Sequence, residues 1–164
     1  MLLAGKEPQL ILFADPNSLT GDAKTNYEIA LQFGIPLTVV DMTNSPEQIN
    51  AATKQWIGEA DWIVDALLGT GVRGAVNASF AAVIDAMNAS PGRRLAVDVP
   101  SGLDCDTGEP LGAATKAQLT ATFFAAKPGL VRPESKKFVG DLHLLQIGIP
   151  VEPMVERLLH DAAE

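Results

Sequence analysis

The stretch LAVDVPSGLDCDTGEP, residues 95–110, carries the pattern that decides the fold class. An apolar run of three residues ends on the carboxylate of Asp98. Pro100 then stops the strand, because proline has no N–H to donate to a sheet. A short, almost wholly apolar run that is closed by a turn is typical of a strand buried on both faces, and such strands belong to parallel sheets.

Apolar runs of this kind recur along the chain and alternate with helical patterns. The helix at 45–60 has the clearest start, with Ser45 as the cap and Pro46 at the first helical position. We expect strands over 10–14, 36–42, 62–69, 93–100, 120–126 and 142–148, and helices over 20–34, 45–60, 77–90 and 150–164. This alternation predicts one α/β domain over residues 1–164, with a mostly parallel sheet that helices cover on both faces.

Composition limits the classes of protein that this chain can represent. The chain is 47% apolar and 20% charged, as in an ordinary globular domain. A net charge of −8 argues against a nucleic-acid partner, which needs a basic surface. Cys105 is the single cysteine, which excludes an internal disulfide and favours a reducing, cytoplasmic location. We expect no membrane span and no secretory leader, because no apolar run approaches the length of about 20 residues that a span requires.

Three strand ends carry residues with useful chemistry. Asp65 interrupts the run at 62–69, Asp98 ends the run at 95–97, and Lys127 follows the run at 120–126. Parallel strands end at the same edge of a sheet, where α/β proteins bind their ligands. Carboxylates there suit a hard cation or acid–base catalysis. A surface lysine remains an equally good interpretation of Lys127 by itself.

A glycine-rich segment, GTGVRG at 69–74, follows the first of these strand ends. It imitates the G-x-G-x-x-G fingerprint of dinucleotide-binding proteins, so an NAD(P)-dependent oxidoreductase is one alternative. That alternative is disfavoured, because the acid expected about 20 residues further on is not convincingly placed and Asp85 comes too early. A flexible turn with a solvated Arg73 is the other interpretation.

Four motifs together resemble a known family. DALLGTGVRGAV (65–76), AVDVPSGLDCDTG (96–108), AAKPGL (125–130) and GDLHLLQIGIP (140–150) occur in this order. The set is similar to the NAD(P)H-hydrate epimerases, or YjeF N-terminal domain family. The resemblance implies a Rossmann-like three-layer α/β/α sandwich, usually a homodimer, with a potassium ion in its site.

The implied reaction is an isomerisation in nicotinamide nucleotide repair. The enzyme interconverts the R and S epimers of hydrated NADH and NADPH (NADHX and NADPHX) at C6 of the ring. A companion ADP- or ATP-dependent dehydratase then uses one epimer. We expect the C6–O bond to open to a planar, iminium-like centre, with a carboxylate moving the proton.

The resemblance also assigns roles to individual residues. Asp65 and Ser101 look like ligands of the potassium ion, and Asp98 looks like the catalytic carboxylate that contacts the substrate. Lys127 is a weaker catalytic candidate beside it. Asp104, Asp106 and Glu109 are expected in a solvated loop. The substrate-binding loop would consist of Gly69, Thr70, Gly71, Val72, Arg73, Gly74 and Ala75.

One family feature is not in the sequence. The family normally has an Asn-Asn-Gly-Gly-Asp loop near its N-terminus, which cradles the substrate phosphates, and residues 1–10 resemble the part after that loop. We therefore expect a domain truncated at its N-terminus, with weak or absent activity in this form. The alternative is a non-catalytic ligand-binding or protein-interaction scaffold. A scaffold that had lost the family's function would not need Asp65, Asp98 and Ser101, so their presence counts against this alternative.

Overall fold

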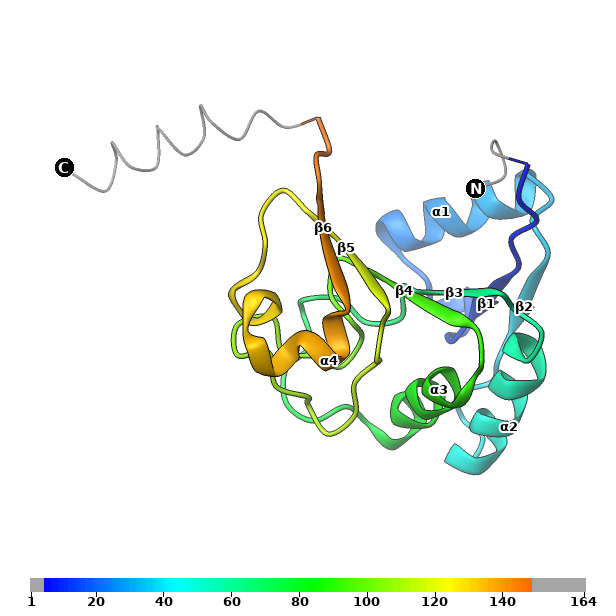
Figure 1. The fold of residues 1–164 in the computed structure, drawn as a ribbon. Coiled ribbons are helices and arrows are strands. Elements are labelled where there is room, and N and C mark those ends of the chain that lie inside the picture. The colour runs from blue at the N-terminus through cyan, green and yellow to red at the C-terminus, as the bar shows by residue number, and fades with distance from the viewer. Residues whose placement is uncertain (1–4, 149–164) are drawn as a thin grey trace. The chain divides into compact units, whose positions relative to one another are not determined.

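The computed structural model describes residues 5–148 (Figure 1), and these form two compact units. Unit 1 contains residues up to Asp61 together with Val76–Gly92, and unit 2 contains Trp62–Ala75 and the chain from Arg93 onward. The helix expected over 150–164 lies outside the described residues. Within residues 5–148, no helix has the length and apolar character needed to cross a bilayer.

Unit 1 contains a two-stranded parallel sheet and three α-helices. Strands β1 (Leu10–Leu12) and β2 (Leu37–Val39) pair in parallel, joined by the 3₁₀ turn η2 (Pro16–Ser18) and helix α1 (Gly21–Gln32). Helices α2 (Pro46–Ile57) and α3 (Ala78–Ala89) pack against each other.

Helix α2 begins where the sequence predicts, at Ser45. The Ser45 hydroxyl accepts a hydrogen bond from the Gln48 amide, and the Gln48 side chain accepts one from the Ser45 amide, which forms a capping box. Ile49, Thr53 and Ile57 form the buried stripe of the helix at the expected spacing of four residues. The Asn50 amide donates to the carbonyl of Ala82 on α3 at 2.8 Å.

Unit 2 contains a four-stranded parallel sheet in the order β3-β4-β5-β6. Between β5 and β6 the chain forms the 3₁₀ turns η3 (Pro128–Val131) and η4 (Pro133–Ser135) and the short helix α4 (Lys136–Val139). The strands are β3 (Trp62–Asp65), β4 (Arg93–Val97), β5 (Leu119–Phe123) and β6 (Asp141–Leu145).

The two faces of this sheet differ in burial. One face, which we call the buried face, carries the buried residues Ile63, Asp65, Arg94, Ala96, Thr120 and Thr122. Its β6 residues are less covered: Leu142 is half-buried and Leu144 is 54% exposed. Beside the buried face lies a core cluster drawn from the β4–β5 and β5–β6 connections: Val99, Leu103, Ala114, Leu130, Phe138 and Val139. The other face, which we call the open face, is half-buried or exposed: Trp62, Val64, Arg93, Leu95, Val97, Leu119, Ala121, Phe123, His143 and Leu145. Residues alternate between the two faces because successive side chains along a strand point to opposite sides of the sheet.

The observed elements confirm the predicted α/β class with parallel sheets, but one strand is shorter than expected. The sequence predicts a strand over 62–69, whereas β3 ends at Asp65. The amide of Leu67 donates to the Asp65 carboxylate and the amide of Leu68 donates to the Ser101 hydroxyl, so neither extends the sheet. At Leu67 and Leu68, side-chain oxygens therefore take the place of the carbonyl groups of a neighbouring strand.

A substitution at Gly140, between α4 and β6, tests how closely this connection packs against the backbone at Gln118. Its φ is +63°, and a Cβ there would lie 2.3 Å from the carbonyl oxygen of Gln118. We expect Gly140→Ala to lower the free energy of unfolding by at least about 2 kcal/mol, because both the backbone and the contact become strained. Denaturant unfolding measures the change. Gly71→Ala, where a Cβ meets nothing within 4 Å, is the control, and equal losses in both variants would contradict the packing.

Candidate functional site

The candidate site lies in unit 2, beyond the carboxyl ends of β3, β4 and β5. Asp98 follows the last residue of β4 with φ +69°, and Phe124 follows the last residue of β5 with φ +67°. This left-handed backbone is uncommon for residues other than glycine, although Asp adopts it more readily than most. The Asp98 amide donates to the Ala121 carbonyl at 2.7 Å, which fixes this turn against β5. The residues that follow β4 and β5 therefore both have left-handed backbone, and a hydrogen bond to β5 holds the one at Asp98 in place.

The carboxylate of Asp98 is held by three donors from one segment of chain. Its Oδ1 accepts hydrogen bonds from the Thr122 hydroxyl at 3.0 Å and the Phe123 amide at 3.3 Å, and it pairs with the Lys127 ammonium. Among residues 5–148, each hydrogen bond found to this carboxylate reaches Oδ1. Oδ2 is therefore the oxygen left for a ligand, and the side chain remains 30% exposed.

These contacts also set the charge of Asp98. Partial burial raises the pKa of the carboxyl, but the hydrogen bonds from Lys127, Phe123 and Thr122 and the charge of Lys127 lower it by more. The net pKa lies below the ordinary value of 3.8. At neutral pH the group is an anion and a hydrogen-bond acceptor, and it is not a resting proton donor.

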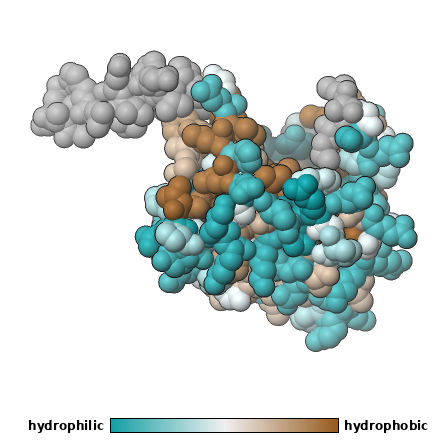
Figure 2. Space-filling model, in the orientation of Figure 1, coloured by the Kyte–Doolittle hydropathy of each residue, from teal (hydrophilic) through white to brown (hydrophobic). Residues whose placement is uncertain are grey.

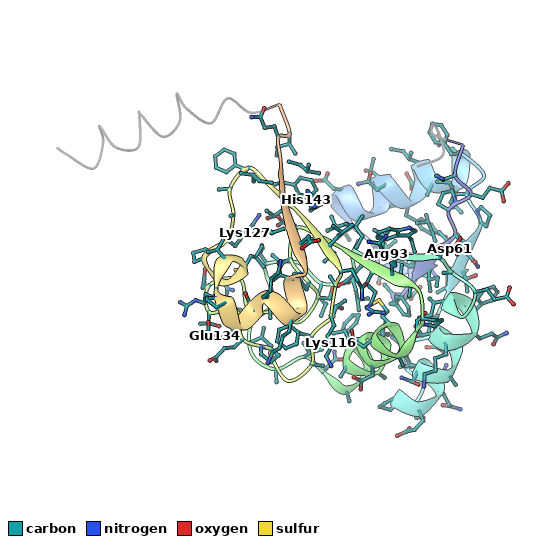
Figure 3. All side chains as sticks on the ribbon, viewed as in Figure 1. Asp61, Arg93, Lys116, Lys127, Glu134 and His143 are labelled. Atoms are coloured by element: carbon teal, nitrogen blue, oxygen red, sulfur yellow. The ribbon has the colours of Figure 1, made fainter. Side chains whose placement is uncertain are left out.

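Lys127 meets Asp98, as the shared strand edge predicts, and is labelled in Figure 3. Its ammonium group donates to three acceptors: the Asp98 carboxylate, the Thr122 hydroxyl at 2.9 Å and the Phe123 carbonyl at 3.2 Å. An ammonium has three N–H groups, and these contacts use all of them. In this arrangement Lys127 is therefore paired with Asp98, and its role in a reaction stays a prediction.

Asp65 and Ser101 also meet, in a second cluster that joins the loops after β3 and β4. Asp65 is 1% exposed, and its oxygens accept hydrogen bonds from the Ser101 amide at 2.8 Å and the Ser101 hydroxyl at 2.5 Å. The Ser101 oxygen in turn accepts a hydrogen bond from the Leu68 amide at 2.8 Å and lies 3.3 Å from the Leu68 carbonyl oxygen. A buried carboxylate thus ties two loops together.

The second cluster has oxygen donors of the kind that an alkali cation prefers. They are the carboxylate of Asp65, the hydroxyl of Ser101 and the carbonyl of Leu68. Nearby, the Thr115 amide donates to the Ser101 carbonyl, and the buried Thr115 hydroxyl has no hydrogen-bond partner. Over residues 5–148, no three His, Cys, Asp or Glu side chains gather into a possible metal centre. These oxygen donors suit a hard cation better than a transition metal that prefers nitrogen or sulfur ligands.

The predicted substrate-binding loop, Gly69–Ala75, is largely exposed. Cβ atoms added at Gly69 and Gly71 would meet nothing within 4 Å, so its backbone is open to a ligand. The Arg73 guanidinium lies 3.4 Å from the carbonyl oxygens of Thr70 and Val72, within its own loop. The loop is thus accessible, and the hydrogen bonds that Arg73 makes among residues 5–148 are long contacts to main-chain oxygens.

The remaining acids of the opening stretch lie outside these clusters, as predicted. Asp104 is half-buried and accepts hydrogen bonds from the Asp106 and Thr107 amides of its own loop. Partial burial raises the pKa of the Cys105 thiol, and the charges of Asp106 and Asp104 raise it further. Cys105 is therefore a poor nucleophile.

Sequence reasoning missed two members of the site, Thr122 and the Leu68 carbonyl. Thr122 is fully buried and lies between Lys127 and Asp98. The available signal was the sequence TAT at 120–122, which places two hydroxyls on one face of a strand expected to be apolar. A backbone carbonyl leaves no signal in a sequence.

A parallel sheet that alternates with helices and carries a carboxylate and a lysine at its carboxyl ends is typical of Rossmann-like α/β domains. Residues 1–129 match the family described as YjeF-related protein N-terminus. The chain belongs to this family.

Similar proteins share this chain's sequence over most of its length. A NAD(P)H-hydrate epimerase of Pirellula staleyi is 37% identical over 147 residues, which are 90% of this chain and 63% of the relative. A bifunctional NAD(P)H-hydrate repair enzyme Nnr of Pyrobaculum aerophilum is 40% identical over 150 residues, 91% of this chain and 29% of the relative. This chain therefore spans less than two thirds of the length of either relative.

A solved structure has the same fold. The crystal structure of yeast ynu0, YNL200c, matches with a TM-score of 0.65 at 19% identity, covering 90% of this chain and 58% of the yeast chain. This likeness supports the predicted Rossmann-like fold class.

The ion pair at the site can be tested through the pKa of Asp98. Replacing Lys127 by Met removes a hydrogen bond and a positive charge, so we expect the pKa of Asp98 to rise. A depressed carboxyl pKa stabilises the fold above the unfolded value of 3.8, and this stability is lost as the pH falls through the folded pKa. The variant should therefore have a lower free energy of unfolding at neutral pH. That free energy should also change less as the pH is lowered. Carbon-13 NMR titration and unfolding at pH 7 and pH 3 measure both effects.

Lys136→Met is the matched control, because Lys136 pairs with Asp141 at 3.2 Å with both side chains well exposed. We expect this control to change stability by at most about 0.5 kcal/mol and to leave the Asp98 titration unchanged. A titration of Asp98 that is identical in both variants would contradict the ion pair.

Proposed function

We propose that the domain acts as an NAD(P)H-hydrate epimerase, interconverting the R and S forms of NADHX and NADPHX. The observation that carries the proposal is the ionised carboxylate of Asp98, with Oδ1 fully engaged and Oδ2 left for a ligand beyond the strand ends. Membership of the family and the names of the two relatives above support it.

The chemistry follows from the substrate. C6 of the hydrated ring carries a hydroxyl and is bonded to the ring nitrogen, whose lone pair can displace the C6–O bond. Breaking that bond releases hydroxide, which becomes water on taking up a proton, and leaves a planar iminium cation. Addition of water to the opposite face forms the new C–O bond and releases a proton.

Asp98 contributes mainly by charge. Its anion stabilises the positive charge that develops on the ring, because the fixed donors hold it in place before the reaction. Oδ2 can also accept a hydrogen bond from the departing or attacking water. The low pKa makes Asp98 a weak base, so proton transfer is the smaller part of its role.

Other parts of the site would bind the nucleotide. The loop Gly69–Ala75 offers open backbone to phosphate groups, and Arg73 offers a cation. Asp65, Ser101 and the Leu68 carbonyl would hold the potassium ion. When bound, the ion supplies a fixed positive charge near the anionic substrate.

The setting of this reaction is also part of the proposal. The bifunctional relatives are named as repair enzymes, which supports a dehydratase as the companion that consumes the product. We place the domain in the cytoplasm and propose a homodimer.

Direct assay of the chain tests the proposal. The isolated R epimer of NADPHX is mixed with the chain, and S epimer is followed by chromatography against the uncatalysed rate. Because the family's phosphate-cradling loop is not in this sequence, we expect only a weak acceleration, and we expect Asp98→Asn to remove most of it, because a preorganised charge is lost. Asp106→Asn, an acid of the exposed loop, should leave the rate unchanged. Absence of acceleration would overturn the epimerase proposal, and binding of NADP without turnover would then favour a non-catalytic ligand-binding domain.

Thr122 provides a second test of the same site. Its hydroxyl accepts from Lys127 and donates to Asp98, so we expect it to be a positioning residue. Thr122→Val keeps the shape and should lower kcat roughly 10-fold, with a smaller change in KM and a raised Asp98 pKa. Thr122→Ser keeps the hydroxyl and should restore both kcat and the pKa. Equal behaviour of the two variants would show that the hydroxyl does not matter.

A further inference from the structure

The residues that follow β4 and β5 close the same rare kind of turn. The Val99 amide donates to the Val97 carbonyl at 2.9 Å across Asp98, and the Ala125 amide donates at 2.8 Å to the carbonyl two residues earlier, across Phe124. A hydrogen bond between residues i and i+2 with a positive φ between them is the strained form of the γ-turn. Such backbone persists where surrounding contacts hold it, and it is concentrated at functional sites.

The turn at Phe124 is the less expected of the two. Asp is one of the few residues whose short polar side chain tolerates left-handed backbone, whereas a bulky aromatic residue in that conformation is an outlier. At Phe124 φ is +67°, and neither Gly nor Asn occupies the position. The residue type therefore does not explain the turn, and its contacts have to.

Apolar surroundings explain the aromatic ring of Phe124 but not its backbone. The residue is half-buried, and its amide donates to the Leu145 carbonyl of β6 at 3.4 Å. Figure 2 shows hydrophobic residues gathered over the part of the molecule where β6 lies, and Leu145 is 46% exposed. A large apolar side chain suits this place in any backbone conformation, so the ring does not require a left-handed φ.

The contacts of Phe123, the residue before the turn, supply a reason. Its amide donates to Oδ1 of Asp98 at 3.3 Å, and its carbonyl accepts hydrogen bonds from the Lys127 ammonium at 3.2 Å and from the Ala125 amide. The Ala125 hydrogen bond exists only while Phe124 keeps the γ-turn. The turn therefore holds the Phe123 carbonyl where Lys127 meets it.

The turn also brings Lys127 back to the end of β5. If the strand continued in extended backbone, four further residues would carry the chain about 13 Å beyond Phe123. The Lys127 ammonium instead contacts the Phe123 carbonyl, the Thr122 hydroxyl and the Asp98 carboxylate. The chain must reverse between residues 123 and 127, and the γ-turn at Phe124 is the first step of that reversal.

We propose that Phe124 is a positioning residue of the site, and that it acts through its left-handed backbone and not through its ring. The turn places the Phe123 amide, the Phe123 carbonyl and the Lys127 ammonium around Asp98. This inference rests on the role that the proposed function gives to Asp98. Its test uses the full chain without substrate, so a failed epimerase assay and a failed positioning test are separate results.

Two substitutions at Phe124 separate the backbone from the ring. Phe124→Gly removes the ring but adopts a positive φ without strain, so we expect the pKa of Asp98 to stay below its ordinary value of 3.8. Phe124→Val disfavours the turn, because a β-branched residue rarely adopts positive φ. In that variant we expect the pKa of Asp98 to rise and the Phe123 amide to exchange with solvent at least about tenfold faster. Carbon-13 NMR titration and hydrogen exchange measure the two effects.

Phe123→Val is the matched control, because the same change one residue earlier falls in extended strand, which β-branched residues suit. We expect the pKa of Asp98 to be unchanged in this control. Should Phe124→Val not fold, Phe124→Ala, which differs from Phe124→Gly by one methyl group, replaces it with the same expected direction. An equal rise of the pKa in the Gly variant would show that the ring matters, and no rise in either variant would show that the turn does not position Asp98. Each of these results would overturn the proposal.

Discussion

The buried carboxylate of Asp65 is the constraint on which the site depends. A polar group that is 1% exposed is costly to bury unless hydrogen bonds compensate for the lost water. The Ser101 amide, the Ser101 hydroxyl and the Leu67 amide supply those bonds. They end β3 early and tie its loop to the turn after β4. Asp98 lies in that turn, three residues before Ser101, so its left-handed backbone is fixed from both sides by Asp65 and by the Ala121 carbonyl.

The two strand-end carboxylates therefore have different tasks. Asp65 uses both oxygens inside the protein, which makes it a structural group that can also face an ion. Asp98 uses one oxygen inside the protein and remains 30% exposed, which suits a group that meets a ligand. The register of β4 and β5 creates this difference, because pairing Val97 with Ala121 brings Thr122 beside Asp98.

Much of the fold follows from the sequence for simple reasons. Apolar runs between turn residues located each strand that residues 5–148 form, and the Ser45-Pro46 start located α2. The meeting of Asp98 with Lys127 was predictable, since parallel strands end at one edge. The end of β3 was not, because Leu67 and Leu68 are apolar and only their amide contacts remove them from the strand. Thr122 was missed because its role depends on strand register, and α4 is too short to show a helical period.

The structure also argues against the glycine-rich segment 69–74 being the cofactor-binding fingerprint of an NAD(P)-dependent oxidoreductase. In a dinucleotide-binding fingerprint, the glycines lie where a strand turns directly into a helix whose N-terminus holds the pyrophosphate. Here β3 ends at Asp65 and α3 begins at Ala78, so Gly69–Gly74 lies in a long loop that does not open the helix. The fixed anion of Asp98 does not by itself separate the two reactions, since hydride loss from a dihydronicotinamide also leaves a positively charged ring. A reaction that passes through a cation gains directly from such an anion, because the Asp98 charge is present and oriented before the positive charge forms.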